Sequence, residues 1–380
     1  MPIKKCIYGL AAALTAILVS APGVSFAAQP EAPRARDLGI PFDGQTGPLN
    51  AITDVAGVEV GHRTIIEGDS IRTGVSAIFP LGKGDPRGVR AAMATINGTG
   101  EVTGAHMIEE LGLMFGPILL TTTWSVGTVR DGYLAWVKQN LPEQLWVLYS
   151  LPVVAETLDD GLNDAFGMHV TRQHTIEALN AATGGPVSEG NVGGGTGMQA
   201  YGFKGGIGTA SRQLRLGEDT YTIGVLVQSN HGTRENLRIA GLPVGEELTA
   251  TGTPGTDESN GKNSLIIVMA TDLPLRPDQL ERLARRGALG LGRTGAVATT
   301  ASGEFVIAFS TAGATDFEDR QALSHVSFTA FSDMDAIFNA AVQAVEEALI
   351  NQLVASEDMS GSGLTVRALP HDDIRRLFAD

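Results

Sequence analysis

Glycine is the feature that most constrains the fold of this chain, because 48 of its 380 residues are glycine, well above the usual share of ~7%. The glycines follow no Gly-X-Y period, which excludes a collagen helix. They separate short apolar runs instead, a pattern typical of tight turns and of backbones that approach closely. Since 43% of the residues are hydrophobic and 18% charged, the chain can bury a large core.

Apolar patterning predicts both strands and helices. Short apolar runs bounded by turn residues predict strands, and apolar spacing near 3.6 residues predicts helices. The expected strands are 55–60, 75–81, 91–96, 221–228, 265–270 and 305–309. The expected helices are 105–115, 129–140, 171–182, 277–288 and 334–354, and residues 249–262 are expected to form a long exposed loop. Because strands and helices interleave, the expected class is layered α/β or α+β.

Composition and spacing exclude several classes of function. With 27 Lys and Arg against 42 Asp and Glu, the formal net charge is −15, which disfavours binding to nucleic acid or to an anionic membrane. Cys6 is the only cysteine, so neither a disulfide scaffold nor a cysteine nucleophile is expected. The seven histidines lack metal-binding spacing, and there is no P-loop and no Gly-x-Ser-x-Gly elbow. No metal or other cofactor is therefore expected.

Two glycine-rich segments have more than one interpretation. Residues 290–295 match Gly-x-Gly-x-x-Gly, but they follow an expected helix instead of a strand, so a glycine-rich helix exit fits better than a dinucleotide site. Residues 193–197 could bind an anion through their backbone N–H groups. The simpler interpretation is a tight crossing between strands.

The first 27 residues have the pattern of a secretory signal peptide. Lys4 and Lys5 precede an apolar stretch over 7–19, and Ser25-Phe26-Ala27 fits a small-x-small cleavage site. The alternative is an N-terminal anchor that is retained. Cleavage would leave a mature chain that begins at Ala28 and contains no cysteine. In a Gram-negative host this chain is expected in the periplasm, without membrane contact after removal of the signal.

Ser264 lies between the expected loop and the expected strand 265–270. A hydroxyl held there could attack the preceding carbonyl and split the chain. The new α-amine, which titrates near ~7.7–8.0, could then act as the base for its own side chain. From the spacing alone, a serine at a strand edge without a catalytic role is the simpler interpretation.

Long blocks of the sequence resemble the P1 family of aminopeptidases. These blocks are 35–39, 50–55, 151–157, 189–198, 204–209, 225–232, 262–265 and 302–305. The chain is most similar to the bacterial β-peptidyl aminopeptidases and second to the L-aminopeptidase/D-esterases. The resemblance implies a four-layer αββα sandwich of the N-terminal-nucleophile-like type, without a metal. It also implies self-cleavage between Asn263 and Ser264 into an α chain (28–263) and a β chain (264–380) that form one domain, and a homotetramer of αβ pairs.

The resemblance further implies roles for five residues. Ser264 would be the nucleophile of both self-cleavage and acyl-enzyme formation. Ser302 and Glu304 would form an accessory pair that hydrogen-bonds to Ser264, and their spacing of two places them on one face of a strand. Asn230 would donate to the oxyanion. Glu156 would receive the ammonium of the substrate.

The expected reaction is hydrolysis of N-terminal β-amino acids from short peptides, amides and esters with a free N-terminus. L-aminopeptidase/D-esterases look to have a tyrosine two residues after the glutamate, and Leu158 occupies that position here. The more apolar pocket favours the β-peptidyl reaction. One alternative is an L-aminopeptidase/D-amino-acid esterase that acts on α-amino acids. The other is a non-catalytic exported binding protein with the same fold.

Overall fold

The computed structural model describes residues 33–144, 151–252, 263–315 and 328–379. The expected signal peptide and residues 253–262 of the expected loop lie outside these ranges. Within them, none of the helices combines the length and the apolar character needed to cross a membrane.

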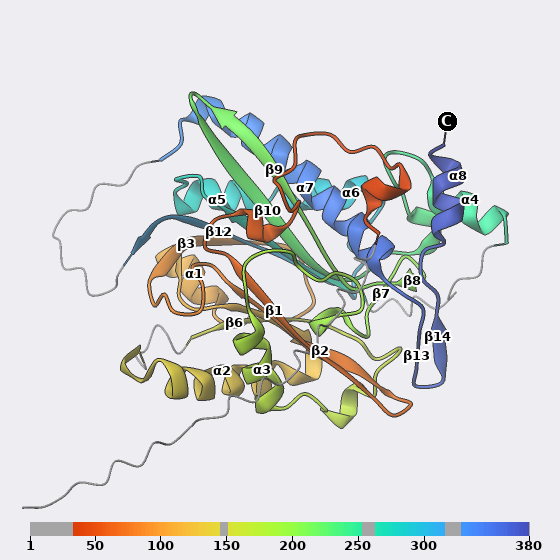
Figure 1. Cartoon of the computed structure of the whole chain (residues 1–380), viewed down its shortest axis with the longest axis horizontal. Helices are drawn as coiled ribbons and strands as arrows, with labels where there is room; N and C mark the ends of the chain where they lie inside the picture. The colour runs from red at the N-terminus through yellow and green to blue at the C-terminus, as the bar shows by residue number, and fades with distance from the viewer. Residues whose placement is uncertain (1–32, 145–150, 253–262, 316–327, 380) are drawn as a thin grey trace, which may run out of the picture. The chain divides into compact units, whose positions relative to one another are not determined.

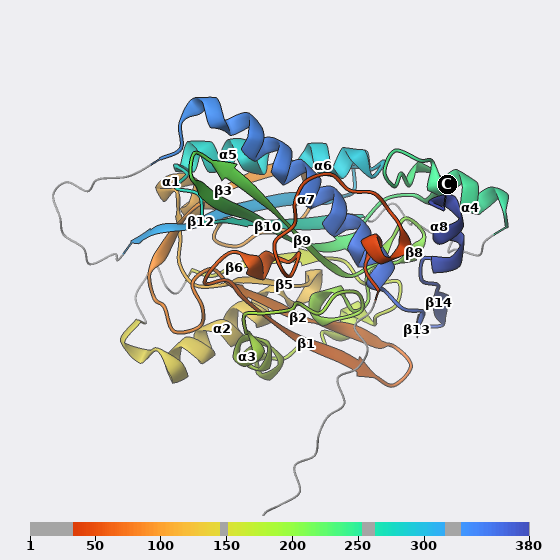
Figure 2. The ribbon, with the colours of Figure 1, turned by 45° about the horizontal axis from the view of Figure 1, so that its top comes forward.

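Two β-sheets form the centre of the fold (Figures 1 and 2). The smaller sheet has the order β1 (Glu59–Glu67), β2 (Ile71–Phe79), β5 (Ile118–Thr122), β6 (Val153–Thr157). The larger has the order β4 (Leu113–Met114), β3 (Gly88–Gly98), β12 (Gly303–Thr315), β11 (Ser264–Thr271), β10 (Asp219–Asn230), β9 (Ile207–Leu216). The pairs β5/β6 and β11/β12 are parallel, and the other neighbours are antiparallel.

Helices cover the outer face of each sheet, as Figure 2 shows. The helices α2 (Val126–Asn140) and α3 (Arg172–Ala181) pack on the four-stranded sheet. On the six-stranded sheet lie α5 (Pro277–Ala284), α6 (Gly287–Arg293) and α7 (Met334–Ala355). The remaining helices are α1 (Ala105–Leu111), α4 (Val244–Ala250) and α8 (His371–Leu377), and two small hairpins pair β7 (Gln199–Ala200) with β8 (Phe203–Lys204) and β13 (Met359–Gly361) with β14 (Leu364–Val366). This arrangement is the expected four-layer αββα sandwich of the α+β class.

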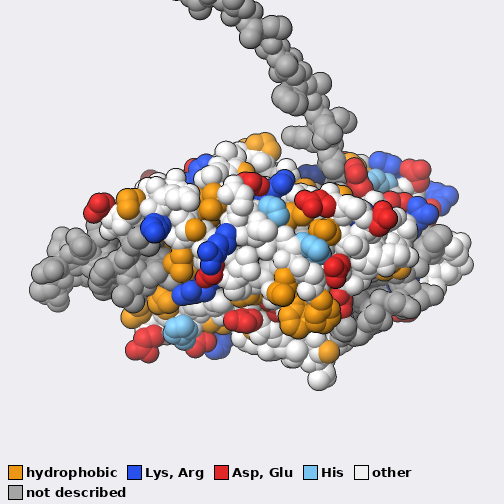
Figure 3. Space-filling view, turned by 90° about the horizontal axis from the view of Figure 1, so that it is seen from below, with side chains coloured by type: hydrophobic (Ala, Val, Ile, Leu, Met, Phe, Trp, Pro, Cys, Tyr) orange, Lys and Arg blue, Asp and Glu red, His pale blue; other side chains and the backbone are white. Residues whose placement is uncertain are grey.

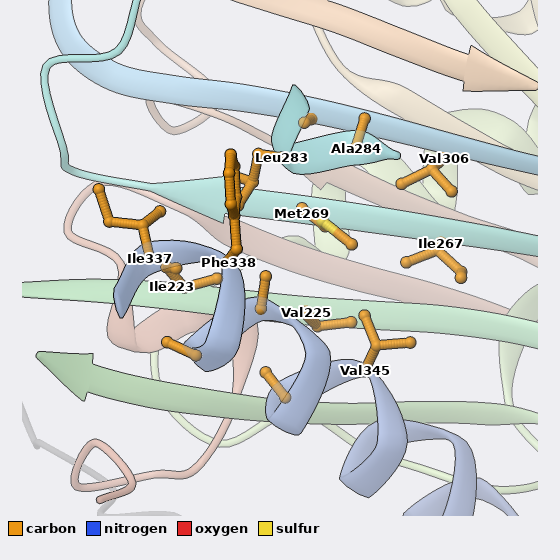
Figure 4. Close-up of a cluster of buried hydrophobic side chains, with 14 of the residues drawn as sticks. Ile223, Val225, Ile267, Met269, Leu283, Ala284, Val306, Ile337, Phe338 and Val345 are labelled. Carbon is orange, nitrogen blue, oxygen red and sulfur yellow. The ribbon is translucent and has the colours of Figure 1, made fainter. Parts of the chain in front are cut away.

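Strand β11 shows why the central strands are continuous apolar runs. All of its residues are buried, because helices cover one face and the second sheet covers the other. The odd-numbered side chains from Leu265 to Met269 pack against α5 and α7, and the even-numbered ones from Ile266 to Ala270 face the four-stranded sheet. Figure 4 shows Ile267 and Met269 in the helix-side cluster. Burial on both faces leaves β11 no freedom to shift its register.

Most expected elements are present, and three need correction. The strand expected at 55–60 is wrong, because a turn with Gly57 at φ +90° precedes β1. The helix expected at 105–115 ends at Leu111, where Gly112 adopts φ +63° and caps it. The helix expected at 277–288 is two helices, α5 and α6, with a break at residues 285–286.

The Gly-x-Gly-x-x-Gly segment is a helix and its exit. Gly290 and Gly292 lie inside α6, and Gly295, at φ +89°, follows its end. A Cβ on Gly290 would lie 2.6 Å from the Cβ of Val345 in α7. Glycine therefore serves helix packing here, as the helix-exit interpretation favoured, and not a dinucleotide.

Charged side chains of both signs are interspersed on the face shown in Figure 3. Ion pairs between such exposed side chains contribute little to the free energy of unfolding. Glu347 in α7 differs because it is fully buried. It accepts hydrogen bonds from Arg36 Nε (2.8 Å), Arg212 Nη2 (2.6 Å) and Asn50 Nδ2 (2.6 Å). Burial acts to raise the pKa of Glu347, but these donors outweigh it and hold the pKa below its usual value. The network ties the N-terminal segment and β9 to α7.

Replacing Glu347 with Leu should lower the free energy of unfolding by about 3–5 kcal/mol, because Arg212 would stay buried without its counter-charge. Denaturant titration followed by circular dichroism measures this loss. Glu246→Leu is the matched control, since Glu246 forms an exposed pair with Arg238 and should cost no more than about 1 kcal/mol. Equal losses in the two variants would contradict this account of Glu347.

Candidate active site

Ser264 is the first residue of β11, and the neighbouring strands fix its position. It is opposite Asn230 in the antiparallel ladder with β10 and opposite Gly303 in the parallel ladder with β12. Strand alternation places the Ser264 and Asn230 side chains on the face that looks toward the four-stranded sheet, together with Ile266. The hydroxyl is therefore held at the edge of the space between the sheets.

The backbone of the opposite sheet reaches this hydroxyl. Leu158 directly follows β6, and its N–H donates to Ser264 Oγ at 3.2 Å. A donor at this distance can stabilise negative charge on an oxygen bound at the site. The sequence pointed only to the side chain of Leu158, because nothing in a sequence marks the direction of a backbone N–H.

The Gln199 backbone sets the orientation of the Asn230 amide. Gln199 N–H donates to Asn230 Oδ1 at 2.9 Å, and only the oxygen of an amide can accept that bond. Nδ2 is thus the end of the amide that would donate to an oxyanion. Asn230 is buried beside Ser264, as the implied role requires.

The peptide bond between Asn263 and Ser264 is polarised by the adjacent strand. Gly303 N–H donates to the carbonyl oxygen of Asn263 at 3.2 Å. Only glycine fits at 303 without displacement, because a Cβ there would lie 2.4 Å from the carbonyl oxygen of Thr99. The register of β11 with β12 therefore places the Gly303 N–H on the carbonyl oxygen of Asn263. This is the carbonyl that Ser264 would attack in the expected self-cleavage.

Ser302 and Glu304 are brought together, as expected. Both are buried, and the Ser302 hydroxyl donates to Glu304 Oε1. Burial raises the pKa of the Glu304 carboxyl, although the bond from Ser302 opposes this effect. The second oxygen, Oε2, is buried and has no hydrogen-bond partner among the described residues.

The pair does not reach the Ser264 hydroxyl in the continuous chain. Along β12, Glu304 lies on the face of Leu265 and Val306, opposite to that of the Ser264 side chain. Glu304 instead lines a hollow beside Asn263, together with His231 and residues 296–299. No hydrogen bond joins the pair to Ser264 in the described part of the chain, so the implied contact stays a prediction about the cut form.

Glu156 is a buried carboxylate in β6, two residues before Leu158. Its oxygens accept from Glu101 N–H (3.1 Å) and from the Thr123 hydroxyl, and within the described ranges it forms no ion pair with a cation. Burial raises its pKa despite these two hydrogen bonds. A Cβ on Gly100 would lie 3.0 Å from Glu156 Oε1 and 3.7 Å from the Cα of Gly303. Gly100 therefore leaves space between the carboxylate and the strand edge where Ser264 lies.

The described residues contain no group of three or more His, Cys, Asp or Glu side chains arranged to hold a metal ion. A hydroxyl that accepts a backbone N–H, at the head of a central strand of an αββα sandwich, fits the fold class of the N-terminal-nucleophile hydrolases. The comparisons with known proteins agree with this class.

The chain belongs to peptidase family S58, whose model matches residues 50–366. It is 51% identical to the β-peptidyl aminopeptidase BapA of Sphingosinicella xenopeptidilytica, over 96% of this chain and 95% of that protein. Among solved structures it is similar to the L-aminopeptidase D-Ala-esterase/amidase of Ochrobactrum anthropi, described as a variant of the Ntn hydrolase fold (TM-score 0.85, 44% identity, 91% of this chain and 99% of that one). A β-aminopeptidase of Burkholderia sp. matches with a TM-score of 0.84 and 42% identity, over 91% of this chain and 98% of that one.

These matches confirm the resemblance to the aminopeptidases and the fold class. They identify the chain as a hydrolase of a peptidase family, with peptides as the class of substrate, and so rule against the non-catalytic binding protein.

Replacing Gly303 with Ala should slow self-cleavage by about tenfold or more, which corresponds to ~1.4 kcal/mol in the barrier. The added Cβ displaces β12 from Thr99 and weakens the bond to the Asn263 carbonyl. Denaturing gel electrophoresis over time gives the cut fraction. Gly292→Ala is the control, because a Cβ there meets nothing within 4 Å. A Gly303→Ala chain cut as fast as this control would contradict the prediction.

Proposed function

We propose that this chain is a self-processed serine aminopeptidase that hydrolyses N-terminal β-amino acids from short peptides, amides and esters. The observation that carries the proposal is the Ser264 hydroxyl at the head of β11, opposite Asn230 and 3.2 Å from the Leu158 N–H. Similarity to β-peptidyl aminopeptidases over nearly the whole chain supports the substrate class.

Self-cleavage would begin with attack of Ser264 Oγ on the carbonyl carbon of Asn263. The Gly303 N–H, already on that carbonyl oxygen, would stabilise the developing negative charge. The C–N bond then breaks, the Ser264 nitrogen takes up the hydroxyl proton, and an ester joins Asn263 to Ser264. Water hydrolyses this ester. The products would be an α chain (28–263) that ends in a carboxylate and a β chain (264–380) that begins with the amine of Ser264.

In turnover, Glu156 would bind the substrate ammonium and so place the first carbonyl next to Ser264. The hydroxyl attacks, its proton passes to the Ser264 amine, and Asn230 Nδ2 and Leu158 N–H stabilise the oxyanion. The amine returns the proton to the leaving group, which leaves an acyl-enzyme that water hydrolyses. Ser302 and Glu304 would hydrogen-bond to the Ser264 amine once the cut has freed it, and Glu304 Oε2 has the acceptor capacity for this.

An L-aminopeptidase/D-esterase is the second candidate, because a structure of that activity matches the chain with a TM-score of 0.85. Leu158 favours the β-peptidyl reaction, since a leucine supplies no phenol and makes the pocket more apolar.

We further propose export to the periplasm after removal of residues 1–27, and assembly into a homotetramer of αβ pairs. Both of these rest on the sequence pattern and the family resemblance.

Replacing Ser264 with Ala should give a chain that stays uncut and inactive, because neither the hydroxyl nor the new amine would exist. Intact-mass spectrometry should find the two fragments in the wild-type protein and one continuous chain in the variant. Asn263→Ala is the matched control. It keeps the hydroxyl and the carbonyl bond to Gly303, and should still be cut. Turnover by the Ser264→Ala chain would place the nucleophile elsewhere.

The wild-type enzyme should hydrolyse β-homo-amino-acid p-nitroanilides faster than the matching α-amino-acid compounds, as release of p-nitroaniline measures.

N-acetylated substrates should not react, because they lack the ammonium that Glu156 binds. Glu156→Gln should lower kcat/KM by about 10- to 100-fold, the equivalent of one charge-assisted hydrogen bond. A strong α preference would favour the second candidate, and turnover of the acetylated compounds would remove the role of Glu156.

A further inference from the structure

A glycine-rich loop over 193–198 lies between the two sheets next to the candidate site. It leads into β7, where Gln199 N–H holds Asn230 Oδ1. A Cβ on Gly194 would lie 2.0 Å from Gln228 Oε1, and one on Gly195 would lie 2.5 Å from Ile207 N. Glycine lets the loop enter this narrow space, but it brings no side chains that could fix the loop in one conformation.

Gly193 N–H and Gly194 N–H donate to Thr64 Oγ1 and Ser76 Oγ, and the fully buried Lys204 fixes the part of the loop that leads to β7. Its Nζ donates to three backbone carbonyls: Met198 O (2.8 Å), Gly205 O (2.5 Å) and Gly195 O (3.3 Å). Two of these belong to the glycine loop, and Lys204 itself pairs with Gln199 across the β7/β8 hairpin. Within the described ranges its ammonium forms no ion pair. Burial lowers its pKa to about 7, against the opposing charge of Asp159.

Asp159 packs against the same loop at Gly197. It follows Leu158 directly and is buried, and its Oδ1 accepts from Thr122 Oγ1 (2.6 Å) and Asn163 Nδ2 (3.0 Å). Its Cβ would lie 2.9 Å from a Cβ on Gly197. The side chain thus anchors the turn that carries the Leu158 N–H and packs against the loop that leads to Gln199. Burial raises its pKa to about 6.

Stability alone does not explain why two ionisable side chains, Lys204 and Asp159, are buried beside this loop. Removing a charge from water costs several kcal/mol even in a relaxed protein interior, and apolar side chains of similar volume often fill such sites without loss of stability. Here Lys204 holds the loop that leads to Gln199 and Asn230, and Asp159 holds the turn that carries the Leu158 N–H. The loop therefore sets the spacing between Asn230 on one sheet and Leu158 on the other.

We propose that Lys204 and Asp159 are positioning residues of the acyl-transfer site. Lys204 clamps the glycine loop through its carbonyls and Asp159 packs against it at Gly197, and so they hold Asn230 Nδ2 and the Leu158 N–H at the separation that the oxyanion requires. The inference rests on the proposed function. It adds that loop position, and not only the two donors themselves, determines the rate of acyl transfer.

A double-mutant cycle with Asn230→Ala tests the clamp, using the cut enzyme and p-nitroanilide substrates. Lys204→Met keeps the length of the side chain and removes its three donors. It should lower kcat by about 10- to 100-fold with KM changed by less than about twofold, a loss below that of removing an oxyanion donor outright. In the Asn230→Ala background the same substitution should cost less than about threefold, because the donor that it misplaces is already absent.

The enzyme is counted by active-site titration, so that kcat refers to folded sites only. Arg212→Met is the matched control. It also removes a buried cation, but one that pairs with Glu347 beneath α7, so it should lower the melting temperature while kcat per titrated site stays unchanged. If Lys204→Met yields no folded enzyme, Lys204→Gln enters the same cycle, since an amide has only two N–H donors for the three carbonyls.

Equal losses with and without Asn230, or a fall in melting temperature with unchanged kcat, would overturn the clamp. Neither result would affect the proposed function, which fails only if the wild-type enzyme does not turn over substrate or if the Ser264→Ala chain does. The smaller loss in the Asn230→Ala background would support the clamp.

Discussion

Strand β11 is hydrogen-bonded on both edges and buried on both faces, and the rest of the site depends on where this strand begins. Its ladders with β10 and β12 place Ser264 opposite Asn230 and Gly303, and the second sheet brings the Leu158 N–H to the hydroxyl. A slip of one residue would turn the hydroxyl into the helix-side core. Close packing on both faces excludes that slip, so the same apolar burial that stabilises the sandwich also fixes the position of the Ser264 hydroxyl.

The buried carboxylates of this fold are of two kinds, which differ in whether hydrogen-bond donors or burial dominate the pKa. Glu347 has three donors and a lowered pKa, so it acts as a structural tie between the N-terminal segment, β9 and α7. Glu156 and Glu304 instead have raised pKa values because burial outweighs their hydrogen bonds. A buried carboxylate with a raised pKa has capacity for a further partner. In the proposed reaction that partner is an ammonium, which the substrate supplies to Glu156 and the cut chain supplies to Glu304.

The elements that sequence reasoning located have strong local signals. The long apolar period of residues 334–354 predicted α7, and Thr171, whose hydroxyl accepts the His174 N–H at 3.3 Å, marked the start of α3. The strand expected at 55–60 failed because Gly57 turns the chain, and β5 and β6 were not predicted, since five-residue strands buried on both faces carry no alternation. In the site, Ser264, Asn230, Glu156, Ser302 and Glu304 came from the family resemblance, because their roles depend on contacts between distant segments.

The amino-acid sequence alone determined the composition of the core, most of the helices, the acidic surface and, through its resemblance to known aminopeptidases, which side chains to examine. Tertiary structure alone decided how these groups meet. Three backbone contacts show this: the Leu158 N–H donates to Ser264, the Gly303 N–H donates to the Asn263 carbonyl, and backbone carbonyls accept from the Lys204 ammonium. Every residue carries the same backbone groups, so no residue type marks these contacts in advance. Only strand register and the packing of one sheet on the other give those groups a direction.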